Sequence, residues 1–338
     1  MPELWRKLFG SGARRRYEAA LDRATSELAA GRHTEALATL EQGLGDGIRG
    51  YGEGAEELLV AHYAAASAAL AGGELERAEA HGRQGSALAA RHGARSEPPA
   101  HRFLETLAAI EERRAAMHLG AAEGDALEQA LRAYADAALG AGDRRAVAAA
   151  KNRLGLLLAR TERREQAAIE LSEALAIRRS LGAAEARAAL ESAYNLATCR
   201  PLDQGAGAEA LADAASLLDE VVRGTRDASD AAGRELAESA HHNLGVVRDE
   251  RGELDEARRL YERALSLRAK RLGDDHASLR PTLSRLARLE HRAGRLVFAL
   301  GYYERALAIA RRELPEDDPI VRGLERWRDA LTSGEGEA

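Results

Sequence analysis

The sequence predicts an all-α fold built from stacked helix hairpins, and two observations support that prediction. The first is composition: 45% of the 338 residues are apolar but only 4% are aromatic, and much of the apolar fraction is alanine, the best helix former. There are only 7 prolines, and no segment alternates apolar and polar residues as a strand does. The second observation is an internal repeat with a period typical of helical arrays.

The internal repeat is clearest near the C-terminal end of the sequence. One segment, HHNLGVVRDERGELDEARRLYERALSLRAKRLGDDH, begins at His241, and a second, LSRLARLEHRAGRLVFALGYYERALAIARRELPEDD, begins at Leu283. Six residues recur at a constant offset of 42, in the pairs Leu244 and Leu286, Gly252 and Gly294, Ala257 and Ala299, Tyr261 and Tyr303, Ala264 and Ala306, and Leu272 and Leu314. Six matches at one offset are hard to obtain by chance, so each segment is read as one structural unit.

The residue types of this unit predict an antiparallel helix hairpin. A leucine followed by a small residue, as at Leu244-Gly245, suits a first helix that another helix crosses closely. Gly252 follows eight residues after the leucine, where a glycine ends a helix in the left-handed conformation. Ala257 and Ala264 keep the second helix close to the first, and Tyr261 lies between them to fill the gap between successive hairpins.

The same pattern can be followed upstream. Leu154 precedes Ala167 by 13 residues, the step that separates Leu244 from Ala257. About seven hairpins are expected, over roughly 14–44, 53–92, 98–140, 143–181, 185–224, 230–271 and 275–312, with the weakest repeat character at 93–142. A final helix near 317–332, carrying Trp327, is expected to cap the array. This divides the chain into an N-terminal segment (1–13), a repeat array (14–332) and a disordered tail (333–338).

The repeat resembles the tetratricopeptide repeat family, most strongly over residues 143–316. The spacing near 42 and the linkers LGDDH and ELPEDDP resemble the longer-helix variety found in kinesin light chains. The resemblance implies an all-α, right-handed superhelical solenoid of about seven antiparallel helix hairpins with a C-terminal capping helix. It also implies that the first helix of each hairpin lines a concave groove that binds another protein or a peptide.

Three interruptions of the array are expected from glycine and proline. The segment GLGDGIRGYGEG at 43–54 is glycine-dense and is predicted to be a mobile loop, ARSEPPA at 94–100 ends in a proline pair that begins a new helix, and CRPLDQGAGAEA is an insertion at 199–210. Gly45, Gly47 and Gly50 formally match a dinucleotide fingerprint, but the preceding segment has a helical pattern rather than the strand that this motif requires. A flexible interhelical loop is therefore preferred to a nucleotide site.

The sequence contains no set of residues that indicates catalysis, a metal or a cofactor. The ten histidines lack metal-ligand spacing, Cys199 has no second cysteine to share a zinc ion, and no serine-nucleophile motif occurs. The formal net charge of −6 does not favour nucleic acid, which needs a basic face. A single cysteine and the absence of an apolar signal region suit a cytoplasmic location.

The candidate binding residues lie on the predicted first helices. Aligned on the repeat leucine, the preceding position carries Asn195, Asn243 and Arg285, and the position before that carries Asn152, Tyr194 and His242. Arg288 and Arg292, four residues apart on one helix face, add a positive patch that favours an acidic stretch in the partner. Asparagine amides offer both donor and acceptor to an extended peptide, although they could instead serve only to bond neighbouring helices. The pattern of a carboxylate clamp fits poorly, because only Asn243 and Arg285 of its five positions match.

The N-terminal segment carries a second candidate surface. Leu4, Trp5, Leu8 and Phe9 follow helical spacing beside Arg6, Lys7 and Arg14 to Arg16, so they form a basic amphipathic stretch. Such a stretch can fold back on the first hairpin, dock on a partner, or lie on an anionic membrane. The sequence thus predicts a non-catalytic scaffold or adaptor for another protein. The alternatives are a regulatory sensor that changes curvature on binding a peptide, and a membrane-associated assembly factor docked through residues 1–13.

Overall fold

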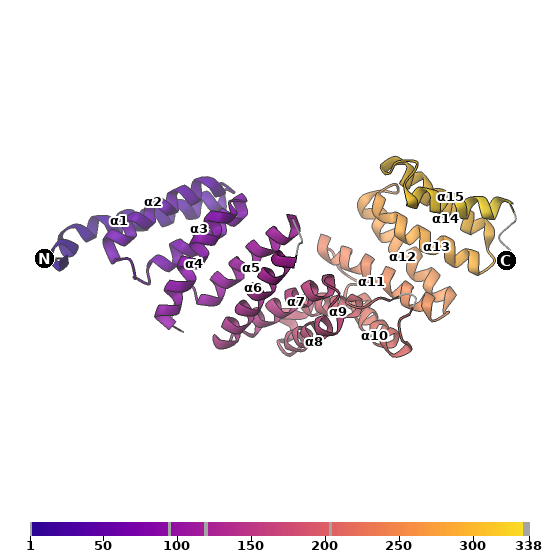
Figure 1. Cartoon of the computed structure of the whole chain (residues 1–338), viewed down its shortest axis with the longest axis horizontal. Coiled ribbons are helices and arrows are strands. Elements are labelled where there is room, and N and C mark those ends of the chain that lie inside the picture. Colours follow the sequence, from indigo (N-terminus) through magenta and orange to yellow (C-terminus); the bar gives the residue numbers. More distant parts are fainter. Residues whose placement is uncertain (1, 94–95, 118–120, 203–204, 334–338) are drawn as a thin grey trace. The chain divides into compact units, whose positions relative to one another are not determined.

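The computed structural model describes the backbone of residues 2–93, 96–117, 121–202 and 205–333, and the side chains of residues 12–93, 96–116, 124–202 and 205–332. Every regular element in these ranges is a helix. The helices form two compact units, residues 1–181 and 182–338, and each unit is a row of antiparallel pairs (Figure 1). The predicted all-α solenoid of seven hairpins with a capping helix is confirmed.

The first unit contains four hairpins, α1/α2, α3/α4, α5/α6 and α7/α8. Its helices are α1 Pro2–Ala29, α2 His33–Tyr51, α3 Leu58–Gly72, α4 Leu75–His92, α5 Ala100–Met117, α6 Ala121–Gly140, α7 Arg144–Arg160 and α8 Arg164–Ser180. Asp143 caps α7 by accepting a 3.0 Å hydrogen bond from the backbone nitrogen of Ala146, which satisfies one of the unpaired amides of the first turn.

The second unit contains three hairpins, α9/α10, α11/α12 and α13/α14, followed by the capping helix α15. Its elements are η2 Gly182–Glu185, α9 Ala186–Thr198, α10 Ala208–Gly224, α11 Ala231–Glu250, α12 Leu254–Leu272, η3 Ala277–Leu279, α13 Arg280–Arg292, α14 Leu296–Glu313 and α15 Pro319–Ser333. The insertion expected at 199–210 therefore falls between α9 and α10.

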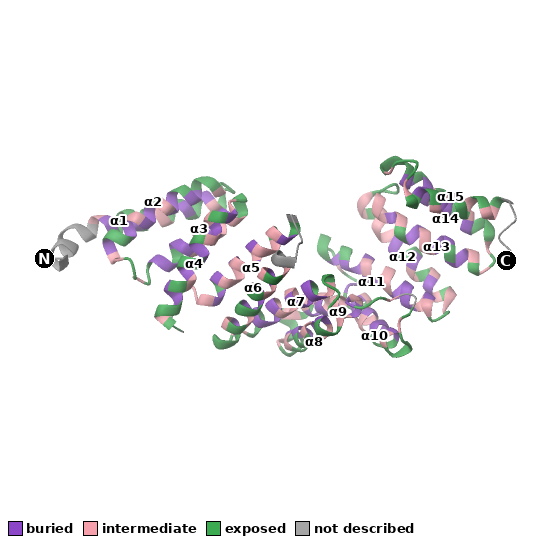
Figure 2. Cartoon of the chain, in the orientation of Figure 1, coloured by how far each residue is buried: buried purple, intermediate pink, exposed green. Residues whose placement is uncertain are grey.

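The small residues of the repeat are buried where the helices cross. Ala257, Ala264, Ala299 and Ala306 are fully buried, and the buried residues of each hairpin face its neighbours (Figure 2). A β-carbon added at Gly245 would lie 2.8 Å from Cδ1 of Tyr261, so the glycine is needed for the tyrosine to fit. The close crossing predicted at the leucine-glycine step is confirmed, and the tyrosine packs there against the first helix of its own hairpin.

The turns between paired helices use the left-handed conformation that the repeat glycine predicts. Gly252 and Gly294 have φ values of 77° and 71°, which cost glycine little. In the α7/α8 hairpin the same place in the repeat is occupied by Glu162, a non-glycine residue with φ 61°. The turn geometry is therefore maintained there against the preference of the side chain.

The prediction of a mobile loop at 43–54 was wrong, because α2 continues to Tyr51. The helical glycines allow α1 and α2 to lie very close together. A β-carbon at Gly43 would come within 2.7 Å of Cβ of Ala20, and one at Gly50 within 2.8 Å of Cγ of Arg14. Each glycine lowers the local helix propensity by roughly 1 kcal/mol, and the helix persists because this packing offsets that cost.

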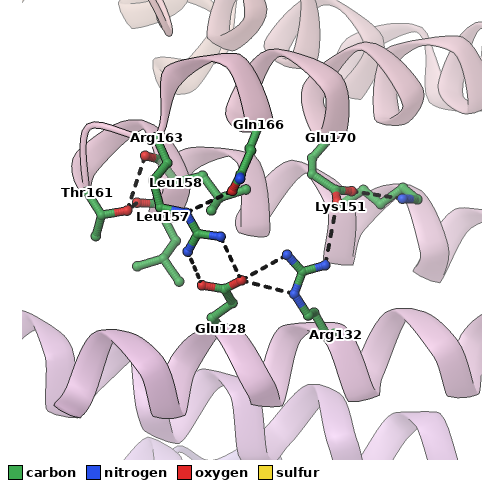
Figure 3. Close-up of polar contacts among 9 residues, drawn as sticks. All are labelled: Glu128, Arg132, Lys151, Leu157, Leu158, Thr161, Arg163, Gln166 and Glu170. Carbon is green, nitrogen blue, oxygen red and sulfur yellow. Dashed lines mark hydrogen bonds and ion pairs between the residues drawn. The ribbon is translucent and has the colours of Figure 1, made fainter. Parts of the chain in front are cut away.

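Ion pairs join the third and fourth hairpins of the first unit (Figure 3). Arg163, in the turn between α7 and α8, donates to Glu128 of α6, and Arg132 donates to the same carboxylate over 2.8 and 3.0 Å. Lys151 of α7 reaches Glu170 of α8 at 2.8 Å. The Arg163 hydrogen bond is the main reason that the pKa of Glu128 is lowered, so this carboxylate stays charged between the hairpins.

Candidate binding surface

Seven of the eight predicted groove residues lie on the first helices of the second unit. We call the side of α9, α11 and α13 that carries Asn195, Asn243 and Arg285 the first-helix face. Tyr194 and Asn195 belong to α9, His242 and Asn243 to α11, and Arg285, Arg288 and Arg292 to α13. All except Arg288 and Arg292 are half-buried, as expected for side chains between neighbouring helices.

Asn243 and Tyr194 bond to each other across the face. The Nδ2 atom of Asn243 donates to the Tyr194 hydroxyl over 2.9 Å. Burial raises the pKa of Tyr194, although hydrogen bonds from Ser239 and Asn243 partly oppose that rise. The hydroxyl therefore stays protonated, and the amide of Asn243 has one structural bond before any partner arrives.

His242 belongs to a chain of hydrogen bonds that joins four helical elements, α11, α12, η3 and α13. Arg268 of α12 donates to the carbonyl oxygen of Ser278 at 3.0 Å and to Oγ1 of Thr282 at 3.3 Å. Thr282 in turn lies 3.0 Å from Nδ1 of His242, whose ring packs against Tyr261. Burial, reinforced by the positive charges of Arg268 and Arg285, lowers the pKa of His242 to about 4. The imidazole is therefore neutral at physiological pH.

The three candidate arginines of α13 differ in how their charge is balanced. Arg292 lies 2.8 Å from the buried carboxylate of Asp249, and Arg285 lies 3.8 Å from Glu250. Arg288 is exposed and forms no ion pair with any residue that the structure describes. The expected positive patch is thus largely compensated by α11, and its unbalanced part is centred on Arg288.

The repeat is recognised by comparison with known proteins. A family model described as tetratricopeptide repeat matches residues 236–312, which cover most of α11/α12 and α13/α14.

This part of the chain carries tetratricopeptide repeats.

Two solved structures share this helical-repeat fold with a TM-score above 0.5, and a third is similar at a lower score. The apo form of RapI aligns with a TM-score of 0.65 at 15% identity, over 95% of this chain and 85% of that chain. PilF of Pseudomonas aeruginosa aligns with a TM-score of 0.53 at 17% identity, over 80% of this chain and 97% of that chain. A kinesin light chain-like repeat protein from Podosopora anserina gives a TM-score of 0.45 at 21% identity, over 55% and 86%. No curated protein sequence matches the chain.

The remaining predicted residues lie elsewhere in the tetratricopeptide array. Asn152 is half-buried on α7 of the first unit, next to Lys151, which pairs with Glu170, and Arg153, which pairs with Glu112. Leu4, Trp5, Leu8 and Phe9 fall within α1, but their side chains are outside the described residues. Fold-back, docking and membrane contact for this segment therefore stay predictions.

Sequence reasoning missed the residues that complete the first-helix face. Thr282 and Arg268 hold His242, and Asp249 neutralises Arg292, but these contacts join residues that are far apart in sequence. Trp327 was assigned only a capping role, although it stands 42 residues after Arg285. The period alone would have placed it in the series of Asn243 and Arg285.

In the part of the chain that the structure describes, no helix combines the length and apolar character that a membrane span requires.

Proposed function

We propose that this protein is a non-catalytic scaffold that binds another protein or a peptide on the first-helix face of its second unit. Repeats of this family are in general scaffolds for protein interaction rather than catalysts, and the fold supports that general role. The partner binds as an extended segment or as a single helix. A cytoplasmic location belongs to the same proposal, since one cysteine suits a reducing compartment.

The recurrence of polar side chains on α9, α11 and α13 is the observation that supports the proposal. Asn195, Asn243 and Arg285 occupy one place per hairpin, so they form a series of polar side chains along the face. Their neighbours Tyr194 and His242 are held by hydrogen bonds. Side chains that are held before binding lose less conformational entropy when the partner arrives.

The test begins with affinity purification from the native host and mass spectrometry to identify a partner, followed by titration of the purified partner. The double substitution Asn243→Ala with Arg285→Ala should weaken binding by about 2 kcal/mol or more if these are central contacts. The substitution Tyr194→Phe is the matched control, because it removes the same internal hydrogen bond but leaves the Asn243 amide in place. Wild-type affinity in a folded double variant would show that the first-helix face is not the binding surface.

A further inference from the structure

Aromatic side chains gather at the C-terminal end of the first-helix face. The rings of Tyr303 and Trp327 are stacked in parallel with centroids 6.2 Å apart, and His291 meets Trp327 edge-on at 5.7 Å. Tyr303 is only 1% exposed, whereas Trp327 remains 45% exposed. The Tyr303 hydroxyl is buried and has no hydrogen-bond partner among the described residues. One face of the indole is thus supported by protein while much of the ring remains accessible.

The repeat shows what this cluster replaces. One period earlier, Tyr261 takes the place of Tyr303, and the charges of Asp249 and Arg285 act on its phenol. The residues 42 positions after Asp249 and Arg285 are His291 and Trp327. The charged residues that surround the repeat tyrosine in one hairpin are therefore replaced by aromatic residues in the last hairpin. Trp327 stands in the same series of positions as the candidate binding residues Asn243 and Arg285.

Arg288 precedes His291 by three residues on α13, so it lies about one helical turn from the ring that meets Trp327. Its charge acts on the Tyr303 phenol, where it partly opposes the rise in pKa that burial causes. The acidic residues of the facing helix α15 have other partners, since Glu325 pairs with Arg311 and Asp329 with Arg328. An anion that approaches Arg288 therefore meets little competition from the described carboxylates.

We propose that Arg288 and Trp327 form a subsite for an acidic residue of the partner together with an adjacent apolar residue. The carboxylate accepts hydrogen bonds from the Arg288 guanidinium, and the apolar side chain packs on the exposed indole of Trp327. An arginine beside an exposed tryptophan has the composition of interface residues that dominate binding energy. The inference rests on the proposed function and names the partner chemistry of one end of the same face.

A capping role for α15 accounts for the Tyr303–Trp327 stack but not for the rest of the arrangement. A cap needs a polar outer surface, whereas 45% of Trp327 is exposed. A capping role also gives no reason for Arg288 to lack an ion pair among the described residues. A subsite that takes an apolar group and a carboxylate explains both features.

The test uses random twelve-residue peptides displayed on phage and selected against the full-length chain. The chain has two tryptophans, so the background substitution Trp5→Phe leaves Trp327 as the only indole. Enriched peptides are synthesised and titrated by the fluorescence of Trp327. We expect them to contain Asp or Glu next to an apolar residue, and to change the Trp327 emission on binding.

Substitutions then assign the two contacts. Affinities of the substituted proteins are measured by isothermal titration calorimetry, because Trp327→Leu removes the fluorophore. Arg288→Gln and Trp327→Leu should each weaken binding of the selected peptides about tenfold or more, while Arg288→Lys, which keeps the charge, should lose less affinity. The matched controls are Arg259→Gln, an exposed arginine of α12, and Phe298→Leu, an exposed aromatic of α14. Both should change affinity less than about twofold. Circular dichroism and melting curves verify that each variant is folded, and Trp327→Phe retains an aromatic ring if the leucine variant unfolds.

The outcomes separate this inference from the proposed function. In one outcome, the peptides bind the Arg288 and Trp327 variants as tightly as wild type but bind the Asn243/Arg285 double variant more weakly. That result overturns the subsite, and the proposed binding face is retained. If no peptide is enriched, or if the enriched peptides bind all of these variants with wild-type affinity, the binding face and its subsite both fail.

Discussion

The amide nitrogen of Asn243 donates to the hydroxyl of Tyr194 over 2.9 Å, joining α11 to α9. Each of these residues is in a place that recurs from hairpin to hairpin, and each was a candidate for partner binding. The bond shows that the first-helix face also connects successive hairpins. A partner that takes the Asn243 amide for itself must compete with this bond, which would couple binding to the packing of α9 against α11.

The coupling between these two residues can be measured in the free protein. Asn243→Ala and Tyr194→Phe should each destabilise the second unit, and the double variant should cost less than the sum of the two. The expected coupling free energy is about 1 kcal/mol, the usual net value of one hydrogen bond. Urea denaturation of the four proteins in the cycle gives this value, and strict additivity would show that the bond contributes nothing to stability.

Gly245 should not tolerate even a methyl group. Gly245→Ala places a β-carbon 2.8 Å from the Tyr261 ring, so overpacking should destabilise the protein by about 1–3 kcal/mol. Gly301 is the matched control, since it lies in helix α14 with nothing within 4 Å of its added β-carbon. Gly301→Ala should stabilise by roughly 0.5–1 kcal/mol because alanine is the better helix former. Melting temperatures that move in the same direction for both variants would contradict the packing argument.

Glu162 holds a turn conformation that favours glycine. Its φ of 61° costs an L-residue roughly 1–2 kcal/mol, and its side chain gains only an exposed ion pair with Arg164. Glu162→Gly should therefore stabilise the first unit by about 0.5–1 kcal/mol. The reverse change in the equivalent turn, Gly252→Ala, should destabilise by about 1 kcal/mol. Chemical denaturation of the two variants is the measurement, and a loss of stability in Glu162→Gly would mean that the glutamate makes a larger contribution than its exposed contacts suggest.

His242 should make the protein sensitive to mild acid. Its pKa of about 4 in the folded chain lies below the ordinary histidine value of roughly 6.5, so the unfolded state takes up the proton first as pH falls. The neutral ring makes its full contribution to the free energy of unfolding above about pH 6.5. As the pH falls from 6.5 to 4, up to about 3 kcal/mol of that contribution is lost. The groups that face the ring are Thr282, Arg268, Arg285 and Tyr261.

Nuclear magnetic resonance measures this titration directly. The ring signals of His242, assigned by their absence in His242→Gln, should be those of a neutral imidazole at pH 5. Thr282 already accepts a hydrogen bond from Arg268, so its own proton points to Nδ1 of His242, and nitrogen shifts should report the Nε2–H tautomer. A His242 midpoint near 6.5 would refute both the burial and the hydrogen-bond chain.

The sequence by itself determined the hairpin and its period. The leucine-small step, the turn glycine and the paired alanines are local requirements of one helix crossing another. They recur at an offset of 42 residues between the last two hairpins, and alignment on the repeat leucine identifies the helices that carry Asn195, Asn243 and Arg285. The same period reaches Trp327, so the aromatic end of the first-helix face was also readable from sequence.

Only the tertiary structure decided which glycines bend the chain and which charges are free. Gly43 and Gly50 read locally as helix breakers, but Ala20 and Arg14 of the neighbouring helix approach them so closely that glycine is the residue that fits a helix there. Likewise, Arg288 and Arg292 are equivalent on a helical wheel, and it is Asp249, 43 residues before Arg292, that neutralises one of them. Both outcomes depend on distances between separate helices, which local propensity and helical periodicity do not specify.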